Sequence, residues 1–147
     1  MLFRSLNQMI VAMGLRREDV FIANVVKCRP PGNRAPMPDE SATCTGLYLV
    51  RQIQIIRPRV IVTLGNPATQ AMLGAVLGIT KIRGQWQKLR RLAEGVEGIP
   101  VMPTFHPAYL LRQYTPENRK AVWEDLQKVM EFLGLQRPAG GAAPEQK

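Results

Sequence analysis

A single histidine stands where one apolar run of the chain ends. His106 is the only histidine of the sequence, and it follows the run Ile99–Phe105. A neutral imidazole carries one donor and one acceptor, so it can serve in catalysis or in a structural hydrogen bond. Because the sites of α/β proteins lie at strand ends, His106 is a candidate functional residue, with a purely structural histidine as the alternative.

Asn24 interrupts another apolar run, Val20–Val26. An amide buried without hydrogen-bond partners costs about 1–3 kcal/mol, so a strand residue of this type needs partners. Its acceptor oxygen and two-proton donor can match the pairing edge of a pyrimidine base. One site could therefore satisfy both Asn24 and His106, while bonds from Asn24 to nearby loop backbone are the structural alternative.

The chain contains two cysteines, Cys28 and, sixteen positions later, Cys44. They are too few for a disulfide scaffold. A zinc or iron-sulfur centre commonly takes about four protein ligands, so these two thiols would supply half of one. His106 is the other strong candidate ligand in the sequence, and two unrelated buried cysteines remain the alternative.

Apolar runs that alternate with helical patterns predict an α/β fold. Continuous runs rich in β-branched residues predict buried strands at Val20–Val26, Arg59–Leu64 and Ile99–Phe105. Apolar spacing and end signals predict helices before Gly14, from Asp39 to the residue before Pro58, from Asn66 to about Val76, and from Pro116 to near Gly134. The basic stretch 79–98 is expected to form a hairpin or an irregular edge. This order is typical of a parallel sheet.

Composition narrows the kind of partner. Lys and Arg number 20 against 11 acidic residues, for a formal charge of +9 over 147 residues, which favours a polyanion such as nucleic acid. A basic surface without a specific partner is the alternative. No apolar run is long enough to cross a membrane, and the N-terminal segment lacks a signal-peptide cleavage site, so a cytoplasmic protein is expected.

Several motifs recur together in the order of a known family. They are the string Val20–Arg34 with its Lys-Cys-Arg-Pro-Pro-Gly-Asn-Arg loop, Pro38, Cys44, Arg57-Pro58, Leu64-Gly65, the segment Pro100–Thr104, and His106-Pro107 followed by Ala-Tyr-Leu-Leu-Arg. In these motifs the chain resembles the iron-sulfur (family 4) uracil-DNA glycosylases, from Leu2 to about Leu135. The resemblance implies a three-layer α/β fold with a central four-stranded parallel sheet flanked by helices, and a [4Fe-4S] cluster near the DNA-binding face.

The same resemblance assigns roles to individual residues. It implies that Cys28 and Cys44 are two of the four cluster ligands, that Asn24 recognises uracil, and that His106 is catalytic. DNA-binding roles are expected for Lys27, Arg34 and Arg112 at phosphates, with Arg29 beside them, and for Leu110 or Leu111 as the side chain that fills the gap left by a flipped base. A solvated rim is the alternative for the basic residues. The expected partner is uracil-containing DNA, single- or double-stranded, bound by a monomer and without a membrane.

The chain also departs from the family pattern. Family members begin with a Cys-x-x-Cys pair and a Gly-Glu-Ala-Pro-Gly-like motif followed by an aromatic residue, and none of these is present. The interpretation is an N-terminally truncated glycosylase domain over residues 1–135, without its first strand and with impaired activity, followed by a disordered tail over residues 136–147.

Three other hypotheses stay open at this point. The fold could serve a non-catalytic nucleic-acid-binding module that uses the basic surface and the His-Pro loop. The two cysteines could instead belong to a zinc- or cluster-stabilised interaction domain. Within the glycosylases, a relative that accepts other deaminated bases would share the same motifs.

Overall fold

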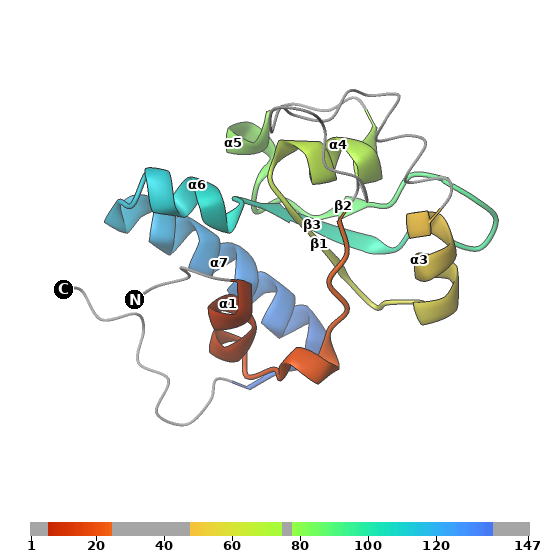
Figure 1. Ribbon diagram of the computed structural model, residues 1–147, viewed down its shortest axis with the longest axis horizontal. Helices are drawn as coiled ribbons and strands as arrows, with labels where there is room; N and C mark the ends of the chain where they lie inside the picture. Colours follow the sequence, from red (N-terminus) through yellow and green to blue (C-terminus); the bar gives the residue numbers. More distant parts are fainter. Residues whose placement is uncertain (1–5, 25–47, 75–77, 137–147) are drawn as a thin grey trace.

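The computed structural model describes residues 6–24, 48–74 and 78–136 of the chain. A long C-terminal helix crosses one side of a small sheet (Figure 1). In chain order the described elements are α1 (Leu6–Ala12), the 3₁₀ helix η1 (Arg17–Asp19), α3 (Val50–Ile56), β1 (Ile61–Leu64), α4 (Asn66–Leu73), α5 (Ile79–Ile82), β2 (Gln87–Lys88), β3 (Pro100–Thr104), α6 (Pro107–Arg112) and α7 (Pro116–Leu133).

The described strands form one sheet in the order β1-β3-β2. Strand β1 pairs with β3 in parallel, with Ile61 opposite Val101, while β2 pairs with β3 antiparallel. The purely parallel sheet that was predicted is therefore wrong for the described residues, which form a mixed sheet. The reason is the connection from β2 to β3: no helix crosses over between them, so the chain folds back beside itself. Residues 79–98 were predicted to form a hairpin or an irregular edge: β2 does lie at the edge of the sheet, but the short helix α5 at the start of this stretch was not predicted.

Strand β3 separates two hydrophobic clusters, which confirms the predicted three-layer fold. Met102 packs in the cluster that α1 and α7 share, represented by Met9 and Val129. Its neighbour Val101 packs instead in the cluster of α3 and α4, because successive side chains of a strand point to opposite faces of the sheet. Figure 1 shows the same division, with α1, α6 and α7 on one side of the sheet and α3 and α4 on the other.

Two prolines lie in the central strand, where proline is normally excluded. The carbonyl of Thr104 accepts a hydrogen bond from the Gly65 N–H at the β1 edge, whereas the carbonyl of Pro103 accepts one from Gly84 on the other edge. Pro103 thus turns its backbone away from β1. On that second edge β2 pairs only with Pro100 and Val101 and does not reach Pro103. The missing N–H of Pro103 therefore costs no hydrogen bond to a neighbouring strand.

The predicted strand at Val20–Val26 does not form over its described part. Residues 20–24 belong to no strand, and Phe21 is 57% exposed; Val25 and Val26 lie outside the described residues. An apolar, β-branched run favours extended backbone, but a strand also requires a partner to which its N–H and C=O groups can bind. None of the described strands pairs with this segment.

Most of the other predicted element ends are confirmed. Helix α7 begins after Thr115, whose hydroxyl accepts from the Asn118 N–H, and ends at Gly134 in left-handed backbone. Helix α4 differs at both ends. It ends at Leu73, earlier than the predicted Val76. At its start Gly65 precedes the helix, and Asn66, predicted to cap it, accepts instead from the Ile79 N–H through its side chain. The predicted tail falls largely outside the described residues, so its disorder stays a prediction.

No helix in the described ranges has the length and apolar character that a membrane span requires.

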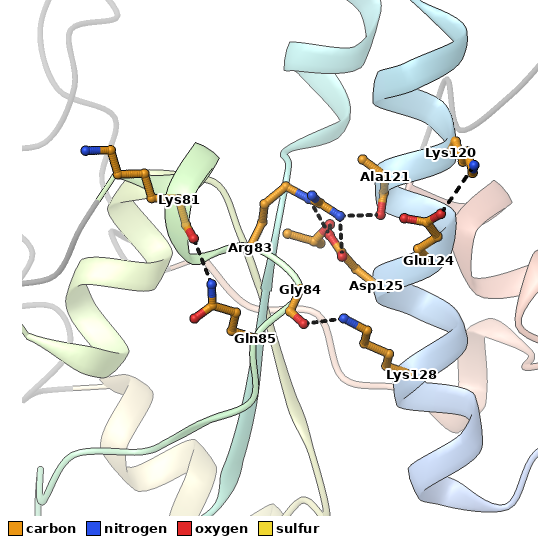
Figure 2. A network of polar contacts seen from close by, with 10 residues as sticks. Lys81, Arg83, Gly84, Gln85, Lys120, Ala121, Glu124, Asp125 and Lys128 are labelled. Carbon is orange, nitrogen blue, oxygen red and sulfur yellow. Dashed lines mark hydrogen bonds and ion pairs between the residues drawn. The ribbon is translucent and has the colours of Figure 1, made fainter.

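A buried ion pair connects α7 to the rest of the fold. The side chain of Asp125 on α7 is fully buried and accepts from Arg83 at both oxygens, from Nε at 3.1 Å and from Nη2 at 2.7 Å (Figure 2). The Thr104 hydroxyl donates to the same carboxylate at 2.6 Å. Burial raises the pKa of Asp125, and the bonds from Arg83 and Thr104 oppose that rise.

The variant Arg83→Met tests how strongly the fold depends on this pair. It leaves a buried carboxylate without its cation, so we expect the free energy of unfolding in urea to fall by about 3–5 kcal/mol. The matched control is Lys120→Met on the same helix α7, because the Lys120–Glu124 pair is long, at 3.8 Å, and exposed. That change should cost less than about 1 kcal/mol. Equal losses in the two variants would contradict the assignment.

Candidate functional site

The candidate site lies where the two parallel strands end. Gly65 follows β1 and His106 follows β3, and parallel strands place their carboxyl ends at the same edge of the sheet. The Gly65 N–H donates to the Thr104 carbonyl at 2.9 Å. A Cβ atom added at Gly65, where φ is +84°, would lie only 3.3 Å from the Cβ of His106. The absence of a side chain at Gly65 therefore lets His106 sit directly against the end of β1.

His106 also begins helix α6. Its Nδ1 atom accepts a hydrogen bond from the Ala108 N–H at 3.0 Å, and Pro107, which has no N–H, occupies the first helical position. An Nδ1 atom that accepts this bond carries no proton, so the neutral ring has its proton on Nε2. The cap therefore leaves Nε2–H as a hydrogen-bond donor for another group.

The surroundings of His106 favour the neutral imidazole. The residue keeps contact with solvent, yet the protein atoms around the ring disfavour its charged form, and this burial lowers the pKa of His106 below its ordinary value. The positive charge of Arg112 lowers the pKa of His106 further. A proton added to the ring would also lie near that guanidinium, so the site holds a neutral donor at neutral pH.

Aromatic packing fixes the start of α6 behind His106. The ring of Phe105 is buried, and its centroid lies 4.7 Å from that of Tyr109 in α6. The Arg83 guanidinium carbon lies 5.7 Å from the Phe105 ring centroid. The residue before His106 and the helix after it are thus held by the same cluster.

The two leucines of α6 occupy different environments. Leu110 is fully buried in the cluster formed by α1, β3 and α7, whereas Leu111 is 54% exposed. A side chain that enters DNA must be able to leave the protein core, so Leu110 does not fit the DNA-contacting role that was predicted for it. Leu111 and Arg112 are exposed, as the DNA contacts predicted for them require.

The remaining predicted site residues are not brought together by the described structure. Asn24 is exposed, and its expected convergence with His106 stays a prediction. Five of them lie outside the described ranges: Lys27, Cys28, Arg29, Arg34 and Cys44. Within those ranges, no three side chains of His, Cys, Asp or Glu gather in a way that could hold a metal ion.

A hollow elsewhere on the molecule does not belong to this site. It has a volume of about 360 Å³ and is lined by residues that include Ile53, Arg57 and Ile99. Ile99 precedes β3, whereas His106 follows it, so the hollow and the histidine lie at opposite ends of the strand.

Comparisons with known proteins identify the family of this chain. The profile of the uracil DNA glycosylase superfamily matches residues 3–127, and the chain belongs to that superfamily. It is 46% identical over 129 residues to the type-4 uracil-DNA glycosylase of Thermotoga maritima, which covers 87% of this chain and 64% of the relative. The type-4 enzymes of Archaeoglobus fulgidus and Sulfurisphaera tokodaii are 41% and 45% identical, covering 90% and 86% of this chain and 66% and 57% of their own lengths. The chain thus spans less than two thirds of each of these relatives.

The pair Gly65→Ala and Gly74→Ala tests the contact between Gly65 and His106. Both glycines have nearly the same positive φ, +84° and +85°, so alanine strains the backbone at either position. At Gly74 the nearest atom to the new Cβ is the flexible Arg90 side chain at 3.6 Å. We expect the imidazole NMR signals of His106 to shift in Gly65→Ala and to stay in place in Gly74→Ala. An unchanged histidine spectrum in both variants would disprove the contact.

Proposed function

We propose that this chain is part of a uracil-DNA glycosylase, a hydrolase of DNA repair that cleaves the N-glycosidic bond between uracil and deoxyribose. The observation that carries the proposal is the state of His106, a neutral imidazole at the carboxyl edge of the sheet whose Nδ1 accepts from the Ala108 N–H, so that Nε2–H is the donor. Membership of the uracil DNA glycosylase superfamily and the names of the type-4 relatives support it.

The chemistry asks for a hydrogen-bond donor of this kind. When the glycosidic bond breaks, negative charge develops on the departing base, and a fixed donor aimed at its oxygen stabilises that charge. We assign this role to Nε2–H of His106. Asn24 is assigned to the pairing edge of uracil, where its amide can both donate and accept. The nucleotide must first leave the duplex, which costs a few kcal/mol that contacts in the site offset.

The variant His106→Asn tests the proposal with little damage to the fold. Asparagine is a good helix cap, so it can accept the Ala108 N–H in place of Nδ1, but it cannot place a donor where Nε2 lies. We expect the single-turnover rate of uracil release to fall by about 10²–10³-fold, the usual effect of losing one such donor. Circular dichroism and thermal unfolding serve as the control for folding.

The pH dependence of uracil release is a second readout of the same test. The reaction needs the neutral ring, and the pKa of His106 lies below its ordinary value. The rate should therefore fall as the pH is lowered and the ring gains a proton, and the midpoint of that fall should lie below about 6.5, the ordinary histidine value. A chain that binds uracil-containing and normal DNA equally, without releasing any base, would support the non-catalytic binding module instead.

The DNA-binding surface is proposed to include the end of α6. Leu111 is the exposed side chain suited to fill the space that a flipped base leaves in the duplex. Arg112 is exposed beside it and is assigned to phosphate contacts, together with Lys27 and Arg34. The formal charge of +9 suits contacts of this kind, which carry no base preference.

Substitutions of Leu111 and of Arg112 should have different effects on uracil release and on DNA binding. Leu111→Ala should slow uracil release from duplex DNA more than from single strands, because only in a duplex does the flipped nucleotide leave a gap between stacked base pairs. Arg112→Gln should weaken binding to both and reduce its salt dependence. The control is Ile55→Ala, which removes an exposed apolar side chain on α3. Equal effects of Leu111→Ala on both substrates would contradict the assigned role.

We further propose that Cys28 and Cys44 serve as two of the ligands of an iron-sulfur cluster, following the family resemblance. The sequence holds only these two cysteines, and such clusters commonly take about four. The cysteines of this chain therefore do not complete the site, and the chemistry assigned to His106 and Asn24 does not pass through a cluster.

Iron content tests this assignment. The 147-residue chain, purified without oxygen, should hold clearly less than one [4Fe-4S] cluster per molecule, because two thiolates hold a cluster weakly. Cys28→Ser should remove the iron that remains, whereas Met37→Leu, in the same segment of sequence, should leave it in place. A full cluster in each molecule, together with rapid uracil release, would overturn the expectation of impaired activity.

A further inference from the structure

Thr104 is held from two sides just before His106. Its carbonyl accepts from the Gly65 N–H at 2.9 Å, which joins it to the end of β1. Its hydroxyl donates to the Asp125 carboxylate at 2.6 Å, which joins it to α7. Both Thr104 and Asp125 are fully buried. The last residue of β3 therefore has its backbone fixed by one element and its side chain by another, two positions before the imidazole.

Arg83 extends the same set of contacts to the residue next to His106. Its guanidinium binds both oxygens of Asp125 and also donates to the Ala121 carbonyl at 2.9 Å. The same group lies over the ring of Phe105, which in turn packs on Tyr109 of α6. The contacts that centre on Asp125 thus reach the residues on both sides of the histidine.

The turn that carries Arg83 is fixed between β3 and α7. The Gly84 N–H donates to the Pro103 carbonyl at 2.9 Å, and the Gly84 carbonyl accepts from the Lys128 amino group at 2.6 Å (Figure 2). A Cβ atom at Gly84 would lie 2.5 Å from an Asp125 oxygen. The backbone of the turn therefore lies against the carboxylate with no room for a side chain.

An apolar residue at position 125 would serve the core without such contacts. Its neighbours on the buried face of α7 are Val122, Leu126 and Val129, and a buried ion pair adds little or no net stability compared with well-packed apolar side chains. The carboxylate instead fixes the positions of the groups that donate to it, because each hydrogen bond restricts both the distance and the angle of its donor.

We propose that Asp125 is a positioning residue for His106: through Thr104 and Arg83 it fixes the end of β3 and the start of α6, and so the direction of Nε2–H. This inference depends on the proposed function, since it concerns the donor assigned to the departing uracil. Catalytic donors act only when they are held close to the productive geometry, and a misplacement of about 1 Å can cost 10²-fold in rate.

The variants Thr104→Val and Thr104→Ser separate positioning from packing. Valine keeps the shape of threonine but cannot donate to Asp125, whereas serine keeps the hydroxyl and loses a methyl group. We expect Thr104→Val to lower the single-turnover rate of uracil release by about tenfold or more, with the affinity for uracil-containing DNA little changed. Thr104→Ser should restore most of that rate.

The control for a purely structural effect is Val129→Ala. Val129 lies on the buried face of the same helix as Asp125, and truncating it removes core contacts while leaving the hydrogen bonds of Asp125 intact. At a temperature where all variants are folded, Val129→Ala should release uracil at the unmodified rate. A rate loss as large as that of Thr104→Val would show that Asp125 acts only through stability and would overturn the proposal.

A measurement without DNA distinguishes this inference from the proposed function. Because His106 is the only histidine, its ring nitrogens give an unambiguous NMR signal in the free protein. Thr104→Val should move those signals toward a mixture of tautomers, and Thr104→Ser and Val129→Ala should not. Unchanged signals in Thr104→Val would overturn the positioning role. If the unmodified chain releases no uracil while Thr104→Val still shows these shifts, the proposed function is rejected and the positioning role remains supported.

Discussion

The buried carboxylate of Asp125 is the interaction on which the arrangement of this edge of the sheet depends. A charge removed from water is costly unless other groups replace its hydration, and here two N–H donors of Arg83 and one hydroxyl do so. Those donors come from the turn after α5 and from β3, while the carboxylate comes from α7. Satisfying one charge therefore requires three separated segments to take fixed relative positions.

The second constraint is the close approach of two strand ends. Gly65 and His106 are far apart in the sequence, and parallel pairing of β1 with β3 brings them into contact. The Thr69 hydroxyl donates to the Gly65 carbonyl at 2.8 Å, so α4 also fixes the backbone against which the histidine lies. The Nδ1 atom of the imidazole accepts a hydrogen bond from the Ala108 N–H, and this bond places the proton of the neutral ring on Nε2. Nε2–H is then the atom that can donate to a ligand.

Local sequence patterns located the elements but not their pairing. The strands β1 and β3 and the helix α7 follow from apolar runs and from end signals such as Pro116 and Gly134, which act within a few residues. The direction of β2 and the missing strand at residues 20–24 could not be predicted in this way, because a ladder depends on partners distant in the sequence. The convergence of Asn24 with His106 is a relation of the same kind, and it was predicted from side-chain chemistry and from the family resemblance.

The candidate site was predictable to a similar extent. His106 was found because it is unique and follows a strand, but its cap on α6 was missed, although Pro107 after it is a signal for a helix start. Asp125 was missed too. An acidic residue between Val122 and Leu126 on an apolar helix face indicates a buried charge, but the identity of its partner, Arg83, more than forty residues earlier, is not encoded in any local spacing.

A neutral histidine suits the proposed reaction because of how its charge state is maintained. Burial is the larger cause of the lowered pKa of His106, and the charge of Arg112 is the smaller one. In the proposed complex, a phosphate beside Arg112 would screen the smaller effect, while bound DNA would exclude water from the ring and strengthen the larger one. On this proposal the imidazole would be neutral before DNA binds, and its Nε2–H would donate to the base without first losing a proton to solvent.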